Sequence, residues 1–458
     1  MKMMCLCLCL LMAILADGQT KKVPPIGGAV STAATICDHP YAVGEAGEGW
    51  PEGPVNILFH HEKSKAPWAH NPAIHVAGLE SAAATARTLV CVEESRLEVG
   101  HYDSGEPGYA PSWSAILVRA SDLRMYFMRI GFNGEMPPSV KYKIGAGVGK
   151  PPTEIFVRWL RLLLEQKVAR FKVLLKSKEY DEPSAMAFSA DGTRLVLAQE
   201  PRRPSGGVAP PSPVTVFDLT TGQPLAAMHA DYSTRAIAIS KSGSMVAMER
   251  YGEVEIWDVA AAQVTRKLET SKVRSLLFAP DDMLGVAGDE KAAVWDIGQN
   301  RIVRSGSGSL VALSPEGTWL AMSRSQDRCI VRELESGQER GNFPCASDQD
   351  TYTPSRDGKT MARSSTLGAT IYMSGNAEGK HAAVPNVGAD TLRAVAPTHD
   401  GFVLGNKDGI IGLVSAATPQ ARAFATDMTS IKAITVSQDG KLVALANSDG
   451  RVEIWELR

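Results

Sequence analysis

The stretch VSQDGKLVALANSDGRVEIWELR, Val436–Arg458, consists of apolar runs separated by two Asp-Gly pairs, with a Trp-Glu pair near its end. An Asp-Gly pair between apolar runs is a strong signal for a tight turn between antiparallel strands. The stretch therefore predicts two turns that join three strands, of which Val452–Leu457 is the last. The sequence ends on that strand, so we expect its outer neighbour to come from elsewhere in the chain.

The same order of apolar strand, polar turn and apolar strand recurs upstream. Its seven copies have these residues at the turn: Asp191, Ser242, Asp281, Glu316, Asp357, Asp400 and Asp439. Successive turns lie between 35 and 51 residues apart. A repeat of roughly 40 residues built from short strands is typical of a β-propeller with four strands in each blade. We therefore expect a mainly β protein with a seven-bladed propeller.

In two of these repeats a later strand ends on a Trp-Asp pair, Trp257-Asp258 in one and Trp295-Asp296 in the other. Phe217-Asp218 and Trp455-Glu456 are near matches. In these features residues 168–458 resemble the WD40-repeat family of β-propellers. The Gly-His pair of the family repeats is missing throughout, so the hydrogen-bond network in which that His takes part is not expected here. The resemblance implies a rigid scaffold that binds protein or peptide partners through one rim.

A propeller must close, because open first and last blades would expose strand edges. The last repeat lacks a fourth strand, and the segment VARFKVLLKSKE, residues 168–179, is apolar and belongs to no repeat. We expect this upstream segment to pair with Val452–Leu457 and close the ring.

The first residues, MKMMCLCLCLLMAILADG, place a short apolar run before Ala16 and Gly18. A basic start, an apolar run and small residues are the signature of a secretory signal, here residues 1–18. The run is shorter than the roughly 20 residues that span a bilayer. We expect cleavage and no membrane span afterwards, with an uncleaved anchor as the alternative. The mature chain would lie in a bacterial periplasm or outside the cell, or follow a eukaryotic secretory route.

Residues 19–167 show no repeat and predict a small α+β domain. The segments VNILFHH, TLVCVEES, RLEVGHY, WSAILVRA and RMYFMRIGF are rich in strand-forming residues, with turns at ESR and SDL. PPTEIFVRWLRLLLEQ predicts an amphipathic helix that Thr153 caps. We expect this helix to pack on the domain's sheet or against the propeller.

Four cysteines remain after cleavage, and an exported protein permits disulfides. Cys329 and Cys345 each lie eight residues from Gly337, the centre of the turn expected between them. Antiparallel strands joined there would place them opposite each other, within disulfide reach. Two buried free thiols are the alternative. By elimination, Cys37 and Cys91 would form a second bridge.

The formal net charge of −2 and pI near 6.5 give no basic surface for nucleic acid. The densest set of potential metal ligands is His60, His61, His70 and His75, although their spacing matches no metal motif. No nucleophile elbow or phosphate loop is present, so no cofactor is predicted, with a metal ion at these histidines as the exception. A metal-dependent hydrolase or lactonase, using these histidines or the central channel, is the enzyme alternative to a binding module.

The resemblance places the partner-binding rim where the first strands begin and where second strands lead into third strands. Tyr and Arg are enriched at binding hot spots, and several fall in these segments. The predicted rim residues are Tyr180, Tyr232, Arg235, Arg250, Tyr251, Arg274, Tyr352 and Arg393. Solvated loop residues are the alternative for each of them.

Overall fold

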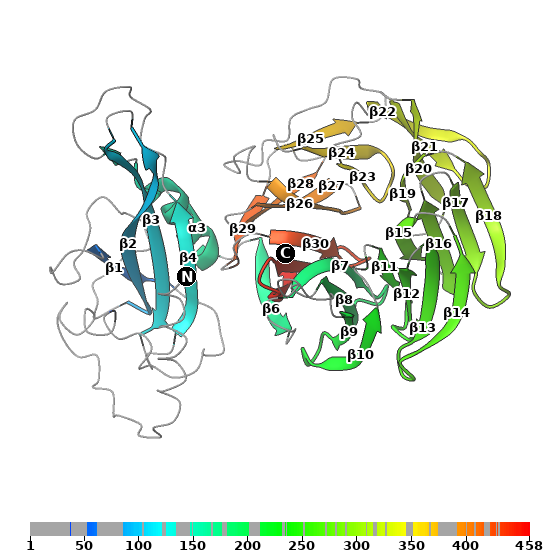
Figure 1. The fold of residues 1–458 in the computed structure, drawn as a ribbon, viewed down its shortest axis with the longest axis horizontal. Coiled ribbons are helices and arrows are strands. Elements are labelled where there is room, and N and C mark those ends of the chain that lie inside the picture. Colours follow the sequence, from blue (N-terminus) through cyan, green and yellow to red (C-terminus); the bar gives the residue numbers. More distant parts are fainter. Residues whose placement is uncertain are drawn as a thin grey trace.

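The fold comes from a computed structural model, which contains an N-terminal sheet with one helix and, after it, a ring of smaller sheets (Figure 1). The described residues are 37, 53–61, 86–102, 105–120, 125–133, 147–148, 150–165, 168–175, 181–200, 211–230, 234, 236–250, 252–270, 273–279, 282–288, 291–307, 309–314, 318–325, 328–344, 351–365, 368–373, 392–399, 401–406, 409–415, 422–426, 428 and 431–458. No helix among them combines the length and apolar composition needed to cross a bilayer.

The N-terminal sheet has the strand order β1-β2-β3-β4, with β5 paired to β3. Its strands are β1 (Val55–His61), β2 (Thr88–His101), β3 (Pro107–Arg119), β4 (Met125–Asn133) and β5 (Gly147–Val148). β1 and β2 are parallel, whereas β2, β3 and β4 follow one another in antiparallel order. Side chains alternate between the two faces, so the apolar residues of one face are available to a covering helix.

The turn predicted at ESR, residues 94–96, is wrong. β2 runs without a break from Thr88 to His101, and its pairing with β3 extends from Thr88 opposite Arg119 to His101 opposite Pro107. Polar residues in the middle of a strand are compatible with a ladder when their side chains reach solvent. The chain instead reverses after Tyr102, whose carbonyl accepts a hydrogen bond from the Gly105 amide.

Helix α3 (Thr153–Glu165) covers one face of this sheet. Phe156, Trp159, Leu160 and Leu163 are buried at the spacing of one helix face. They join a single apolar cluster with β-strand residues, in which Trp113 and Phe132 form edge-to-face ring contacts with Phe156. The predicted helix face therefore forms the core of the N-terminal part.

The helix begins one position earlier than the predicted Thr153 cap requires. The Pro152 carbonyl accepts the first helical hydrogen bond, from the Phe156 amide at 3.0 Å, so Pro152 occupies the cap position and Thr153 the first helical turn. Glu154 in that first turn interacts favourably with the positive end of the helix dipole.

Seven further sheets follow among the described residues, six of four strands and one of three. The first sheet consists of β7 (Glu182–Phe188), β8 (Arg194–Glu200), β9 (Ser212–Asp218) and β10 (Pro224–Ala230). The second consists of β11 (Ile237–Ile239), β12 (Met245–Arg250), β13 (Glu253–Asp258) and β14 (Gln263–Glu269). The third consists of β15 (Val273–Phe278), β16 (Met283–Gly288), β17 (Lys291–Asp296) and β18 (Arg301–Ser307). The fourth consists of β19 (Ser309–Leu313), β20 (Trp319–Ser325), β21 (Arg328–Glu333) and β22 (Glu339–Pro344). The fifth consists of β23 (Thr351–Pro354), β24 (Thr360–Ser365) and β25 (Gly368–Met373). The sixth consists of β26 (Leu392–Pro397), β27 (Gly401–Asn406), β28 (Ile410–Ser415) and β29 (Arg422–Ala425).

The last sheet combines the two ends of this region, in the order β30 (Ile431–Val436), β31 (Leu442–Asn447), β32 (Val452–Leu457) and β6 (Ala169–Leu175). β6 pairs antiparallel with β32, from Val452 opposite Leu175 to Leu457 opposite Ala169. The pairing predicted between the upstream segment and the last strand is therefore confirmed. One apolar cluster joins this sheet to the first one, through residues such as Ile454 and Phe217.

The first strands of the seven sheets lie innermost, and each contacts the next around the ring (Figure 1). The circuit runs through β7, β11, β15, β19, β23, β26 and β30, and β30 contacts β7. Between neighbouring sheets lie apolar clusters, which bury large side chains such as Trp455 and Phe424. The hydrophobic effect on these faces holds the sheets side by side.

A buried serine fixes each described turn between first and second strands. In the first sheet, Ser189 is fully buried, donates from Oγ to Asp191 Oδ1 at 2.6 Å and accepts from the Arg194 amide at 2.9 Å. The same bonds recur around Ser355 and Ser437. Gly192 follows the aspartate with a φ of +70°, a conformation that glycine adopts without strain. This local chemistry explains why the Asp-Gly repeat is visible in the sequence.

Helix α3 also binds the sixth sheet of the ring. Trp159 Nε1 donates to the Thr426 carbonyl at 2.5 Å, and Ala425 belongs to the same apolar cluster as the helix. Thr426 is itself bonded to the Gly409 carbonyl through its amide at 2.8 Å. A Cβ added at Gly409 would meet the Met428 carbonyl at 2.1 Å, so only glycine fits there. The N-terminal part is thus fixed to the propeller through the segment that leads into β30.

Candidate partner-binding face

We call the face where first strands begin the start face, and the face where first strands turn into second strands the turn face. Arg250 ends β12, while Arg274, Tyr352 and Arg393 are second residues of β15, β23 and β26. All four positions therefore belong to the start face, at which the resemblance places the partner-binding rim. The other predicted rim residues, Tyr180, Tyr232, Arg235 and Tyr251, lie outside the described residues.

Five first strands have a bulge at this face, and in three of them the bulged residue is basic. The register with the second strand shifts across Arg274 in β15, Arg393 in β26 and Lys432 in β30. A bulge leaves one residue out of the ladder and redirects its side chain, and bulges are frequent beside functional sites. The bulged residues of β7 and β19 are Ser184 and Val311. A basic residue thus stands at the bulge in three of these five inner strands, and only the strand register reveals this pattern.

Lys432 connects the last and first sheets. Its Nζ lies 2.8 Å from Glu182 Oε1 of β7, and the two side chains are 46% and 50% exposed. An ion pair this exposed contributes little to stability, about 0–1 kcal/mol. A carboxylate of a partner could therefore replace Glu182 at small cost.

Arg250, by contrast, is bound within its own sheet. Its Nη1 donates to Glu255 Oε1 at 2.7 Å, and the side chain of Glu255 is only 1% exposed. Lys267 Nζ lies 2.9 Å from the same oxygen, and Trp257 Nε1 donates to the other oxygen at 3.2 Å. Burial alone would raise the pKa of Glu255, but the hydrogen bonds from Lys267 and Arg250 outweigh it and lower the pKa. This glutamate network therefore stabilises the second sheet and holds Arg250 in place.

The last sheet contains a second glutamate of this kind. Glu453 is fully buried, accepts from Trp455 Nε1 at 3.0 Å and lies 2.6 Å from Arg451 Nη2. These glutamates supply a partner for the Trp N–H in repeats that lack the Gly-His pair of the WD40 family. The signal was present in the sequence as Glu-x-Trp in VEIWDV and VEIWEL, since residues two apart share a strand face.

The histidines predicted as metal ligands are not brought together among the described residues. His60 and His61 are consecutive in β1, opposite Glu93 and Glu94 of β2. His70 and His75 lie outside the described residues. Within the described ranges, no group of three His, Cys, Asp or Glu side chains could hold a metal ion.

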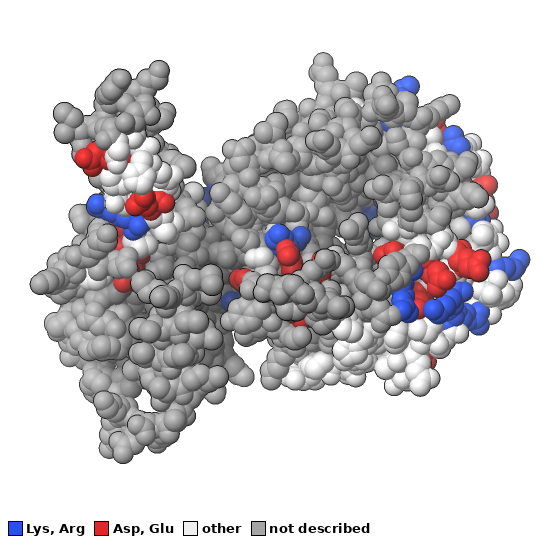
Figure 2. All heavy atoms as spheres, viewed as in Figure 1, with Lys and Arg blue, Asp and Glu red and all other residues white. Residues whose placement is uncertain are grey.

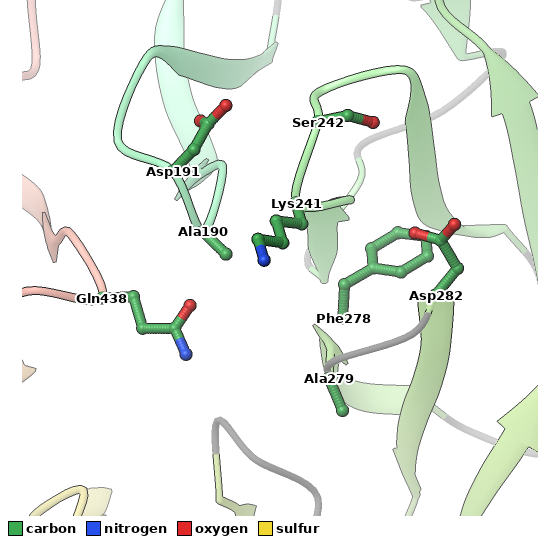
Figure 3. A pocket seen from close by; sticks show the side chains of 8 residues that line it. All are labelled: Ala190, Asp191, Lys241, Ser242, Phe278, Ala279, Asp282 and Gln438. Atoms are coloured by element: carbon green, nitrogen blue, oxygen red, sulfur yellow. The ribbon is translucent and has the colours of Figure 1, made fainter.

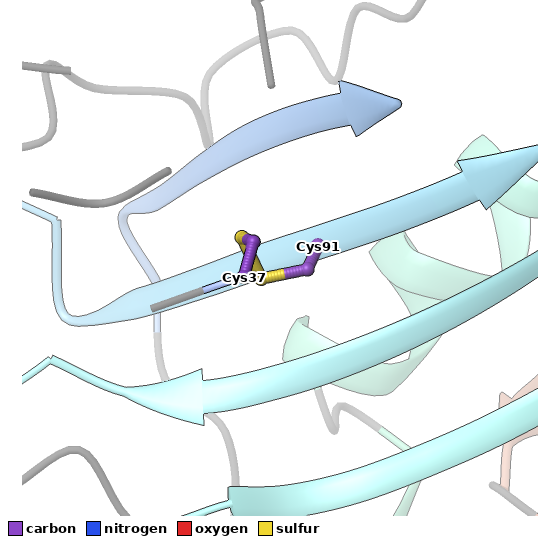
Figure 4. The surroundings of a disulfide bond; sticks show 2 residues. All are labelled: Cys37 and Cys91. Carbon is purple, nitrogen blue, oxygen red and sulfur yellow. A yellow bond between two sulfur atoms is a disulfide. The ribbon is translucent and has the colours of Figure 1, made fainter. Parts of the chain in front are cut away.

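Cys37 and Cys91 form a disulfide with an S–S distance of 2.03 Å (Figure 4). Cys91 lies in β2 between Val90 and Val92, which pack toward α3, so the disulfide is on the opposite face of the sheet. Cys329 is buried and also disulfide-bonded, while Cys345 lies outside the described residues.

The register predicted around Cys329 is wrong by two residues. Cys329 lies opposite Phe343 rather than Cys345. Gly337 is at the end of the turn, with a φ of +69°, and a bulge separates Val331 from Arg332. Centring the turn on the glycine therefore misplaced the partner strand.

Charges of both signs are interleaved where the surface is described (Figure 2). The described outer strands show the same mixture, for example in the contact of Lys267 with Glu253 at 3.7 Å. This distribution agrees with the net charge of −2.

No family model and no curated protein matches the chain in sequence. Among solved structures, the fold is similar to the crystal structure of the WD40 repeats of RRP9, with a TM-score of 0.50 and 14% identity. That match covers 63% of this chain and 100% of the other. Residues from about 168 to 458 thus have a WD40-like β-propeller fold, as the repeats predict. At this identity the likeness concerns the fold alone.

Proposed function

We propose that the chain is an exported interaction scaffold, with a closed seven-bladed propeller whose start face binds a protein or peptide partner. The observation that carries this proposal is the basic residue at the bulge of three inner strands, Arg274, Arg393 and Lys432. Arg and Lys on one face of a protein favour acidic groups on a partner and raise the rate of encounter. The N-terminal domain, fixed beside β29 and β30 by Trp159, would extend the same face.

Affinity capture from the native envelope fraction tests this role. The bait is the mature chain, compared with a variant carrying Arg274→Ala, Arg393→Ala and Lys432→Ala. A matched control removes three exposed cations away from the start face, with Arg170→Ala, Arg301→Ala and Lys359→Ala. We expect a partner that the native chain and the control retain and the start-face variant loses. A partner retained equally by all three would contradict binding at this face.

Export is supported by the disulfides, because such bonds persist in oxidising compartments and are rare in the cytosol. The chain recovered from its native source should begin near Gln19 and fractionate outside the cytoplasm. Non-reducing peptide mapping should also recover Cys37 linked to Cys91 and Cys329 linked to Cys345. A cytosolic chain that starts at Met1 and has free thiols would contradict the proposal.

A further inference from the structure

The turn face contains a hollow of about 480 Å³ at the centre of the ring (Figure 3). Turns of four sheets line it, contributing Asp191 from the first, Lys241 from the second, Phe278 and Asp282 from the third and Gln438 from the last. The hollow is thus shared by sheets that are distant in sequence and adjacent in the ring. It lies at the end of the propeller opposite the start face.

The walls of this hollow are rigid. Ser189, Ser240 and Ser437 are fully buried and fix three of the four lining turns by accepting backbone amides five residues onward. Side chains also join separate turns: Arg194 Nη1 donates to the Gly243 carbonyl at 2.9 Å, and Arg356 Nη1 donates to the Gln438 carbonyl at 2.7 Å. A site built on fixed backbone loses little conformational entropy when it binds.

Lys241 is the cation that lines this hollow, and it is exposed, as is the Asp282 carboxylate on the third sheet. Figure 3 shows its ammonium group directed into the open centre, while the Asp191 carboxylate points away from it. That carboxylate accepts hydrogen bonds from Ser189 Oγ at 2.6 Å and from Thr193 Oγ1 at 2.8 Å. Burial would raise the pKa of Asp191, but these hydrogen bonds lower it, so the group stays ionised in its turn. Within the described part of the chain, the Lys241 ammonium has no ion-pair partner.

We infer that this hollow binds an acidic side chain of a peptide, with Lys241 as the anchor of its carboxylate. The buried ring of Phe278 offers an apolar wall for the methylene groups, and the exposed Gln438 amide can donate a second hydrogen bond. A charge-assisted hydrogen bond in a partly enclosed, preorganised site is stronger than one on open surface. The site is separate from the start face, so the propeller can hold two ligands at once.

Fluorescence anisotropy tests the site with a labelled tetraglutamate peptide and its tetraglutamine counterpart, at physiological salt. We expect Lys241→Gln to weaken binding of tetraglutamate about fivefold or more, and Lys241→Arg to retain most of it. Lys359→Gln is the matched control, because this exposed lysine lies in the equivalent turn of the fifth sheet and does not line the hollow. It should change the affinity less than about twofold.

Equal affinity of the native chain for the two peptides, or equal effects of Lys241→Gln and Lys359→Gln, would overturn the inference. Lys432→Gln separates it from the start-face proposal. Binding of tetraglutamate that depends on Lys432 but not on Lys241 would refute the turn-face site and leave the start-face role intact. If tetraglutamate binding depends on Lys241 and no partner is found at the start face, the turn-face site stands and the start-face role is refuted.

Discussion

The second and third sheets of the propeller have the same Trp-Asp pair but support it differently. In both, the aspartate bonds a backbone amide of the following turn, Asp258 to Ala261 at 2.8 Å and Asp296 to Gln299 at 2.9 Å. Trp257 Nε1 donates to buried Glu255, whereas Trp295 Nε1 is buried and finds no hydrogen-bond partner among the described residues. The Trp-Asp pair therefore determines the hydrogen bond of the local turn. It does not determine whether a glutamate accepts a hydrogen bond from the Trp N–H.

The register shows that the network is absent as a unit from the third sheet. Arg250, Glu255 and Lys267 of the second sheet correspond to Gly288, Ala293 and Ser305 of the third. Losing the glutamate alone would leave two cations without their partner, and adding it alone would bury an unpaired carboxylate. Replacing all three avoids both costs and leaves one unsatisfied Trp N–H.

Removing the glutamate should have the largest effect. Glu255→Ala leaves Arg250, Lys267 and Trp257 without their shared acceptor, and we expect a loss of about 2–3 kcal/mol in the free energy of unfolding. Chemical denaturation measures it. Glu253→Ala is the control: this residue is two positions away on the same strand, 46% exposed and 3.7 Å from Lys267. Its cost should stay below about 0.5 kcal/mol. Similar losses of unfolding free energy in Glu255→Ala and Glu253→Ala would show that the buried glutamate contributes no more than the exposed one.

Transplanting the glutamate alone should destabilise the third sheet. Ala293→Glu places a carboxylate beside Trp295 without the counterparts of Arg250 and Lys267, at an expected cost of about 1–2 kcal/mol. Adding Ser305→Lys, opposite residue 293, should recover about 1 kcal/mol. A double-mutant cycle measures this coupling. Additive effects would show that the cation is not part of the network.

Acid should weaken the second sheet through the same residue. The pKa of Glu255 lies below its usual 4.5, so the folded state releases this proton more readily than the unfolded state. The stabilisation is present above pH 4.5 and disappears as the pH falls through the folded pKa. The stability gap between the native chain and Glu255→Gln, measured by denaturation at several pH values, should therefore narrow on acidification. A constant gap would mean that the carboxylate charge has no role.

The smallest expected effect is a gain. Ala293→Gln offers Trp295 an uncharged acceptor, and satisfying the buried N–H should add about 0.5–1 kcal/mol. Ala293→Leu, which adds bulk without an acceptor, is the matched control. If leucine stabilises as much as glutamine, burial rather than hydrogen bonding explains the gain.

The sequence predicts what local chemistry or strand counting determines. The Ser-x-Asp-Gly turns are local, and the pairing of β6 with β32 follows from a missing strand. The contact of Trp159 with Thr426 joins residues 267 apart, and no short pattern records it. The register of Cys329 depended on a bulge, and the bulged basic residues depended on strand pairing. The hollow around Lys241 requires four turns placed in space.

The indole N–H signals of the tryptophans test the glutamate network most directly. The chain has eight tryptophans, so ¹⁵N-labelled tryptophan gives few resonances, and Trp→Phe variants assign those of Trp257, Trp295 and Trp455. We predict downfield, exchange-protected signals for Trp257 and Trp455, and an upfield signal for Trp295. Glu255→Ala should move the Trp257 signal upfield and leave that of Trp295 unchanged. Three equivalent signals, or a Trp257 signal insensitive to Glu255, would contradict the account.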